Sequence, residues 1–145
     1  ALLQACGESG AAFVAFSPLA RGFLSGGVEG IDAMAEKDIR RGMPRFHEPN
    51  YSANQALFGS FRQLAAEADC TPGQLALNWL LAQGDNILPI PGTRSVDHLE
   101  ENVKAAEINI DPTILARAGE LINQSSVAGE RYPPATQAEI DTEEF

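Results

Sequence analysis

Apolar residues along the chain are spaced so as to predict two short strands and several amphipathic helices. Ala12 to Phe16 and Ile87 to Ile90 are brief, continuous apolar runs. Each run stops at a turn signal, Ser17-Pro18 after the first and Pro91-Gly92 after the second. Short apolar runs bounded in this way are typical of buried strands, and we predict one strand in each place.

Helical spacing and helix-end signals account for most of the remaining chain. Thr71-Pro72-Gly73-Gln74 has the pattern of a capping box with proline at the first helical position, Ser95 can cap the next helix, and Asp111-Pro112 begins the last. Gly10 and Gly84 are typical helix ends. The predicted helices cover residues 1–9, 52–69, 72–83, 96–106 and about 112–122.

Two segments show no such period. The stretch after Phe16 runs without a clear element to about Asn50, and its later part, residues 28–50, contains the tract RRGMPRF from Arg40 to Phe46. We interpret residues 28–50 as a lid or binding loop, because long connections without regular structure are usually functional or disordered. The acidic stretch 126–145 is predicted to be a loosely ordered tail, in which Glu143 and Glu144 form a solubilising end.

The order of these elements predicts the fold class. Strand, loop, helices, strand, loop and helix follow one another as in parallel β/α units, so the class is α/β. Two strands cannot by themselves form a parallel sheet that is covered on both faces. The chain also opens on what reads as the middle of a helix, without an initiator methionine. We therefore expect an incomplete sheet in a chain cut from a longer one.

Charge and composition disfavour several functional classes. Ten Lys and Arg against twenty Asp and Glu give a net charge of −10, which repels nucleic-acid phosphates. The apolar stretches are far shorter than the roughly 20 residues of a membrane helix. Cys6 and Cys70 form neither a disulfide framework nor a metal motif, and His98 has no second ligand nearby. His47, beside Glu48, is predicted to be a solvated residue. We predict a cytoplasmic protein without a metal site.

The segment Ser17-Pro18-Leu19-Ala20-Arg21-Gly22 follows the first strand, at the end where β/α folds build ligand sites. The Ser17 hydroxyl, the amides of Leu19 to Gly22 and the Arg21 guanidinium can hold a phosphate, which Gly22 lets approach closely. The alternative is a strand-ending turn with Arg21 in a surface salt bridge. Loop arginines in an acidic chain also suggest sites for a small anion: Arg21, Arg40, Arg41, Arg45 and Arg94.

A richer constellation, IPGTRSVDHLEEN at residues 90–102, follows the second strand. The helix that starts there offers free amides and a positive dipole end, and Arg94 adds a fork that suits a ribose 2′-phosphate. Thr93 and Ser95 add hydroxyls. One helical face, along which an adenine ring can lie, carries Ser95, His98 and Asn102, with Glu101 beside them. The alternative is a capped surface helix with a solvated face.

Taken together, these blocks resemble the aldo-keto reductase superfamily, in that family's order and spacing and nearly from end to end. The blocks are FVAFSPLARGFLSG from Phe13, PRF from Pro44, TPGQLALNWLL from Thr71, IPGTR from Ile90 and LEEN from Leu99. The resemblance implies that residues 1–145 are the C-terminal part of a (β/α)8 TIM barrel that reduces aldehydes or ketones to alcohols with NADP(H). Residues 12–16 and 87–90 would be its last two strands, and residues 28–50 would cover the cofactor.

The resemblance also implies a set of cofactor-binding residues. They are Ser17, Leu19, Arg21 and Gly22 at the pyrophosphate, Gly92, Thr93, Arg94 and Ser95 on the 2′-phosphate side, Glu101 and Asn102 at the adenine, and in addition Pro18, Ile90 and His98. His98 stands where the family usually has Arg or Gln, a departure that bears on the adenosine contact.

The family's catalytic Asp, Tyr, Lys and His come from earlier strands, and nothing in this chain matches those motifs, so no catalytic residue is named. A (β/α)8 barrel takes about 250 residues. We expect the 145-residue chain alone to be inactive, and to associate with a missing N-terminal half or another copy through its exposed apolar faces. Two alternatives stay open, a nucleotide-sensing regulatory subunit of the same fold and an inactive structural fragment.

Overall fold

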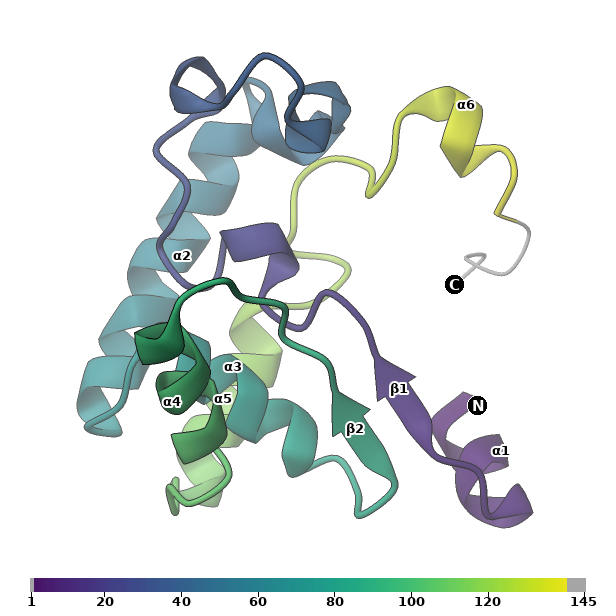
Figure 1. Ribbon diagram of the computed structural model, residues 1–145, viewed down its shortest axis with the longest axis vertical. Helices are drawn as coiled ribbons and strands as arrows, with labels where there is room; N and C mark the ends of the chain where they lie inside the picture. Colours follow the sequence, from purple (N-terminus) through teal and green to yellow (C-terminus); the bar gives the residue numbers. More distant parts are fainter. Residues whose placement is uncertain (1, 141–145) are drawn as a thin grey trace.

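Two short strands pair in parallel in the computed structural model, which describes residues 2–140 (Figure 1). Strand β1 (Phe13–Ala15) lies beside β2 (Ile87–Pro89), with Ala15 opposite Pro89. The pairing continues one residue further, because the amide of Ile90 donates to the carbonyl of Ala15 at 3.1 Å. Both predicted strands are confirmed, and among the described residues they make up the whole sheet.

The five predicted helices lie close to their predicted positions. They are α1 (Leu2–Ser9), α2 (Asn50–Glu67), α3 (Pro72–Leu81), α4 (Val96–Lys104) and α5 (Pro112–Leu121). The short helix α6 (Pro134–Gln137) was not predicted, because it lies in the stretch interpreted as a tail. At the start of α3 the Thr71 hydroxyl accepts from the amide of Gln74, and the Gln74 side chain accepts from the amide of Thr71, both at 3.1 Å. The predicted capping box is therefore present, and Ser95 and Asp111 cap α4 and α5 through their side-chain oxygens.

The main hydrophobic core lies where α2, α3 and α5 pack together beside the sheet (Figure 1). Its buried members are Phe61, Leu64, Ala65, Leu75, Ala76, Ile110 and Ala118. Helix α3 also contacts β2, whose Ile87 is buried together with Ala15 of β1. In contrast, α1 has no buried residue and lies at the outer end of β1, apart from the other helices (Figure 1). The core thus holds the helices and one face of the strands in place.

The other face of the strand pair is only partly covered, by Arg131, whose guanidinium lies over the Phe16 ring 4.5 Å from its centroid. Its apolar side chains alternate along the chain with the buried ones and are more than half exposed: Val14, Phe16, Leu88 and Ile90. Helix α4 likewise exposes Val96, Leu99 and Val103, which recur at helical spacing. Exposed apolar faces of this kind are what the sequence indicated for a partial barrel.

Residues 28–50 fold on themselves. Short 3-10 turns cover Ile31–Ala33, Ile39–Gly42 and Pro44–Phe46. A second buried cluster, formed by Val28, Met43 and Phe46, anchors them, and Phe23 packs edge-on against the Phe46 ring with centroids 5.9 Å apart. The expectation of a stretch without regular structure is wrong here, because turns of three or four residues are too short to show a period in the sequence.

The prediction of a loosely ordered tail from residue 126 is corrected for its first part. The buried side chain of Asn54 on α2 accepts from the amide of Ala128 at 2.8 Å and donates to its carbonyl at 2.9 Å. Arg45 Nε donates to the carbonyl of Gly129 at 3.0 Å. These bonds fix residues 128–129 against α2 and against the turn Pro44–Phe46. A single buried asparagine forms no sequence pattern, so these contacts could not be predicted. The acidic end, Glu143 and Glu144, lies outside the described residues.

Candidate functional site

One cavity of about 480 Å³ lies beyond the carboxyl ends of the two strands. Since β1 and β2 are parallel, the segments that follow them, residues 16–22 and 90–95, reach the same edge of the sheet (Figure 1). The predicted site residues that line this cavity are Ser17, Pro18, Leu19, Arg21, Gly22, Ile90, Gly92, Thr93, His98, Glu101 and Asn102. The structure therefore brings the two sequence constellations together.

The turn after β1 has an unusual backbone. Four of its residues have left-handed φ angles, 51° at Ser17, 49° at Ala20, 57° at Arg21 and 89° at Gly22. This conformation costs an L-residue roughly 1–2 kcal/mol, so contacts around the turn must hold it. Runs of such residues point successive amides in directions that helices and strands do not allow, and they recur at anion-binding loops.

Only part of the predicted set of amides is available to a ligand. The amide of Ala20 donates to the carbonyl of Ser17 at 2.9 Å, and that of Gly22 to the carbonyl of Leu19 at 3.0 Å. The turn thus uses two of the four amides internally, which corrects the expectation that all four face an anion. Among residues 2–140, the amides of Leu19 and Arg21 have no hydrogen-bond partner, and both residues line the cavity.

The segment after β2 is built around the start of α4. The Thr93 hydroxyl accepts from the amide of Ser95 at 3.1 Å, and the Ser95 hydroxyl accepts from the amide of His98 at 3.4 Å. Arg94 and Ser95 are the two predicted residues that do not line the cavity, because the Ser95 hydroxyl caps α4 and the Arg94 side chain is exposed. The exposed first turn of α4 still presents the positive end of its dipole beside Thr93.

Glu101 joins the wall of the cavity to α3. Its carboxylate accepts a short hydrogen bond from the Thr71 hydroxyl, and its carbonyl accepts from Gln74 Nε2 at 3.1 Å. A Cβ atom on Gly73 would lie 3.5 Å from the Glu101 carboxylate, an ordinary van der Waals distance, so the two helices are in contact at this point. The residue predicted to contact an adenine therefore also fixes α4 on α3.

Five further residues line the cavity and were not predicted as site residues: Ser25, Gly26, Gly27, Gly73 and Pro91. Gly26 and Gly27 belong to the glycine-rich loop after the turn, where the sequence indicated only a loop. Gly73 sits inside the capping box of α3, so its sequence context explains it fully without a site. Only the packing of α3 against α4 brings Gly73 to the cavity.

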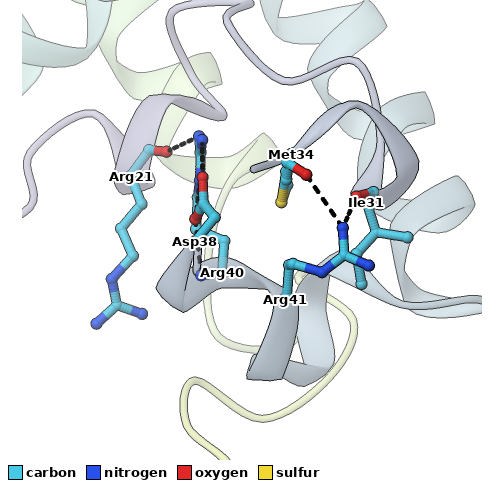
Figure 2. A network of polar contacts seen from close by, with 6 residues as sticks. All are labelled: Arg21, Ile31, Met34, Asp38, Arg40 and Arg41. Atoms are coloured by element: carbon cyan, nitrogen blue, oxygen red, sulfur yellow. Dashed lines mark hydrogen bonds and ion pairs between the residues drawn. The ribbon is translucent and has the colours of Figure 1, made fainter. Parts of the chain in front are cut away.

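The loop arginines do not all serve a ligand. Arg40 makes a two-pronged contact with Asp38, with Nη2 and Oδ2 2.7 Å apart, and donates from Nη1 to the carbonyl of Arg21 at 3.1 Å (Figure 2). Arg41 donates to two carbonyl oxygens of its own loop, at 2.8 and 3.1 Å (Figure 2). Both guanidinium groups thus hold backbone, and neither Arg40 nor Arg41 lines the cavity.

Asp38 carries the clearest electrostatic signature of this network. Hydrogen bonds from Arg40 lower the pKa of the Asp38 carboxyl from 3.8 to about 2. A folded-state pKa below the unfolded value means that the pairing is fully present above about pH 4 and is lost as the pH falls through 2. We expect the 13C signal of the Asp38 carboxyl to titrate with a midpoint near 2. The midpoint should rise towards 3.8 in Arg40→Met, and a wild-type midpoint near 3.8 would contradict the pairing.

Residues 1–123 match the Aldo/keto reductase family. The chain belongs to this family. It is 40% identical over 139 residues to the NADP(+) aldo-keto reductase yakc of Schizosaccharomyces pombe, covering 96% of this chain and 41% of yakc. It is 35% identical over 145 residues to the aldo-keto reductase str7 of Strobilurus tenacellus, covering 100% of this chain and 43% of str7. The chain thus spans about two fifths of the length of these relatives.

The fold of the family is also visible in a solved structure. The chain superposes on the glycerol dehydrogenase AKR11B4 from Gluconobacter oxydans with a TM-score of 0.73 and 19% identity. The match covers 89% of this chain and 38% of that protein. The chain therefore has the α/β architecture of part of an aldo-keto reductase barrel.

Two kinds of feature are absent from the described residues. Within residues 2–140, no helix is both long and apolar enough to cross a membrane. The same residues contain no group of three or more His, Cys, Asp or Glu side chains arranged to hold a metal ion.

Proposed function

We propose that this chain is the C-terminal part of an NADP(H)-dependent aldo-keto reductase that converts aldehydes or ketones to alcohols, and that it provides the cofactor's phosphate and adenosine site. The observation that carries the proposal is that the left-handed turn after β1 and the start of α4 line the same cavity. The family, and a relative whose name specifies NADP(+), support this assignment.

The turn after β1 is suited to the pyrophosphate. The amides of Leu19 and Arg21 and the hydroxyl of Ser17 are hydrogen-bond donors at the cavity, and donors to a charged oxygen form the stronger class of hydrogen bond. Gly22, Gly26 and Gly27 have no side chains that would keep a phosphate away. The donors and the open wall together fit a diphosphate better than an uncharged ligand.

The segment after β2 is suited to the ribose 2′-phosphate and the adenine. The dipole of α4 and the exposed guanidinium of Arg94 favour a negative charge beside Thr93. Further along α4, His98, Glu101 and Asn102 line the cavity and offer polar groups to the edge of a purine. The order from turn to helix therefore follows the order of groups in the cofactor, from pyrophosphate to adenosine.

When bound, NADPH supplies the hydride that reduces the carbonyl carbon. The residues of this chain bind and orient the cofactor, and none of them is assigned a catalytic role. We therefore expect the 145-residue chain to bind NADPH without reducing a carbonyl substrate until the missing part of the barrel joins it. Detectable NADPH-dependent reduction of an aldehyde by the pure chain would contradict this division of labour.

Fluorescence titration with NADPH and NADH tests the proposed site. We expect Arg94→Ala to weaken NADPH binding about fivefold, because an exposed charged hydrogen bond contributes roughly 1 kcal/mol. NADH lacks the 2′-phosphate, so its affinity should not change. Arg62→Ala, which removes the same charge from an exposed position on α2, is the matched control and should leave both affinities unchanged. Absence of NADPH binding to the wild-type chain would overturn the proposed function.

A further inference from the structure

The guanidinium of Arg40 contacts the backbone of the cofactor turn from outside the cavity. Its Nη1 donates to the carbonyl oxygen of Arg21 at 3.1 Å, although Arg40 itself does not line the cavity (Figure 2). The side chain of Arg21 extends away from Arg40 (Figure 2). The contact is therefore made to the Arg21 main chain, where the φ angle of 57° is left-handed.

This contact fixes the peptide group between Arg21 and Gly22 on both of its sides. The carbonyl accepts from Arg40, and the amide of Gly22 donates to the carbonyl of Leu19 at 3.0 Å. A Cβ atom on Gly22 would lie 3.5 Å from Arg40 Nη1, an ordinary van der Waals distance, so the guanidinium lies directly beside the turn. Because a peptide group is planar, these two bonds together fix the orientation of the plane that follows Arg21.

Asp38 holds the guanidinium in the orientation that this contact needs. Oδ1 accepts from the Arg40 amide at 2.9 Å and from Nε at 3.0 Å, and Oδ2 accepts from Nη2 at 2.7 Å. Both side chains are largely shielded, with 25% of Arg40 and 18% of Asp38 exposed. Because the Asp38 carboxylate binds Nε and Nη2, the third guanidinium nitrogen, Nη1, is left to reach the turn.

We propose that Arg40, oriented by Asp38, is a positioning residue that holds the left-handed turn in its cofactor-binding geometry. The proposal rests on the function proposed above. Arg40 acts through the Arg21–Gly22 peptide, so its effect is confined to the pyrophosphate end of the cavity. The segment between Pro91 and Ser95 follows β2, and among the described residues it makes no hydrogen bond to Asp38 or Arg40.

Arg40→Met tests the proposal against a closely matched neighbour. We expect NADPH affinity to fall about tenfold, because the strained turn loses a charge-assisted hydrogen bond. Affinity for adenosine 2′-monophosphate, which lacks the pyrophosphate, should stay within about twofold. Arg41→Met removes the same charge from the same loop, but among the described residues the Arg41 side chain donates to the carbonyls of Ile31 and Met34 and not to the turn, so both affinities should stay nearly unchanged. Arg40→Lys should recover part of the NADPH affinity, since an ammonium group can still donate to the Arg21 carbonyl.

A measurement without ligand separates the two proposals. In the free chain, Arg40→Met should shift the NMR signals of the Arg21 and Gly22 amides and speed hydrogen exchange at Gly22, whereas Arg41→Met should not. If these signals do not move, or if the two variants lose NADPH affinity equally, Arg40 is not a positioning residue even though NADPH binds. If the wild-type chain does not bind NADPH but the amide signals respond as expected, the proposed function fails, although the contact of Arg40 with the turn is confirmed.

Discussion

Replacing Phe61 with alanine is expected to lower the free energy of unfolding by about 3–5 kcal/mol. Phe61 lies on α2 with 3% of its surface exposed, among the residues that join α2 to α3 and α5. Removing the ring leaves a cavity that helices on three sides can only partly close. Because a domain of this size is stable by only about 5–15 kcal/mol, the variant should be close to unfolded at 37 °C.

Urea unfolding followed by fluorescence checks this result, since Trp79 is the only tryptophan of the chain and packs against the same core. Phe61→Leu, which keeps much of the volume, should cost less than about 1.5 kcal/mol. Ile39→Ala, at a residue with 72% exposure, should cost less than about 0.5 kcal/mol. A Phe61→Ala variant as stable as the Ile39→Ala control would show that the helical core is not what holds this chain together.

Replacing Gly22 with valine is expected to weaken NADPH binding roughly thirtyfold, which corresponds to about 2 kcal/mol. The φ angle at Gly22 is 89°, a value that a β-branched residue adopts only under strain. The new Cβ atom would make only ordinary contacts, 3.5 Å from Arg40 Nη1 and 3.9 Å from the Val28 side chain, so the cost arises from the backbone conformation. The turn should change its conformation and withdraw its amides from the cavity.

Gly42→Val provides the matched control, since a Cβ atom there would meet nothing within 4 Å. Isothermal titration calorimetry with NADPH, preceded by thermal unfolding of each variant, distinguishes a lost site from a lost fold. Equal NADPH affinities in the two variants, with both folded, would mean that the geometry of the turn is unimportant for binding.

Much of the fold was predictable because local signals agree with one another. The capping box at Thr71, the caps at Ser95 and Asp111, and the apolar runs of the two strands each specify their element without help from the rest of the chain. The buried contact of Asn54 with Ala128, and the 3-10 turns within residues 28–50, depend on contacts between distant segments or on turns too short to show a period. No sequence pattern predicted these contacts or turns.

The candidate site divides in the same way. Ser17, Gly22 and Thr93 were predicted because they belong to the segments that follow the strands, where parallel β/α units build sites, and all three line the cavity. Sequence alone suggests Arg40 as an anion ligand, because it does not show that Arg40 pairs with the carboxylate of Asp38, two residues earlier. An arginine near a glycine-rich turn reads the same in sequence whether it binds a phosphate or the backbone beside it.

The register of the two strands has a consequence for how cofactor preference can change. With Ala15 opposite Pro89, one strand pair sets the separation between the turn after β1 and the start of α4. Under the proposed function, recognition of both the pyrophosphate and the 2′-phosphate is then encoded in one uninterrupted stretch of sequence. Such a stretch can be exchanged between homologues as a cassette, so that preference for NADPH or NADH is inherited separately from the choice of carbonyl substrate.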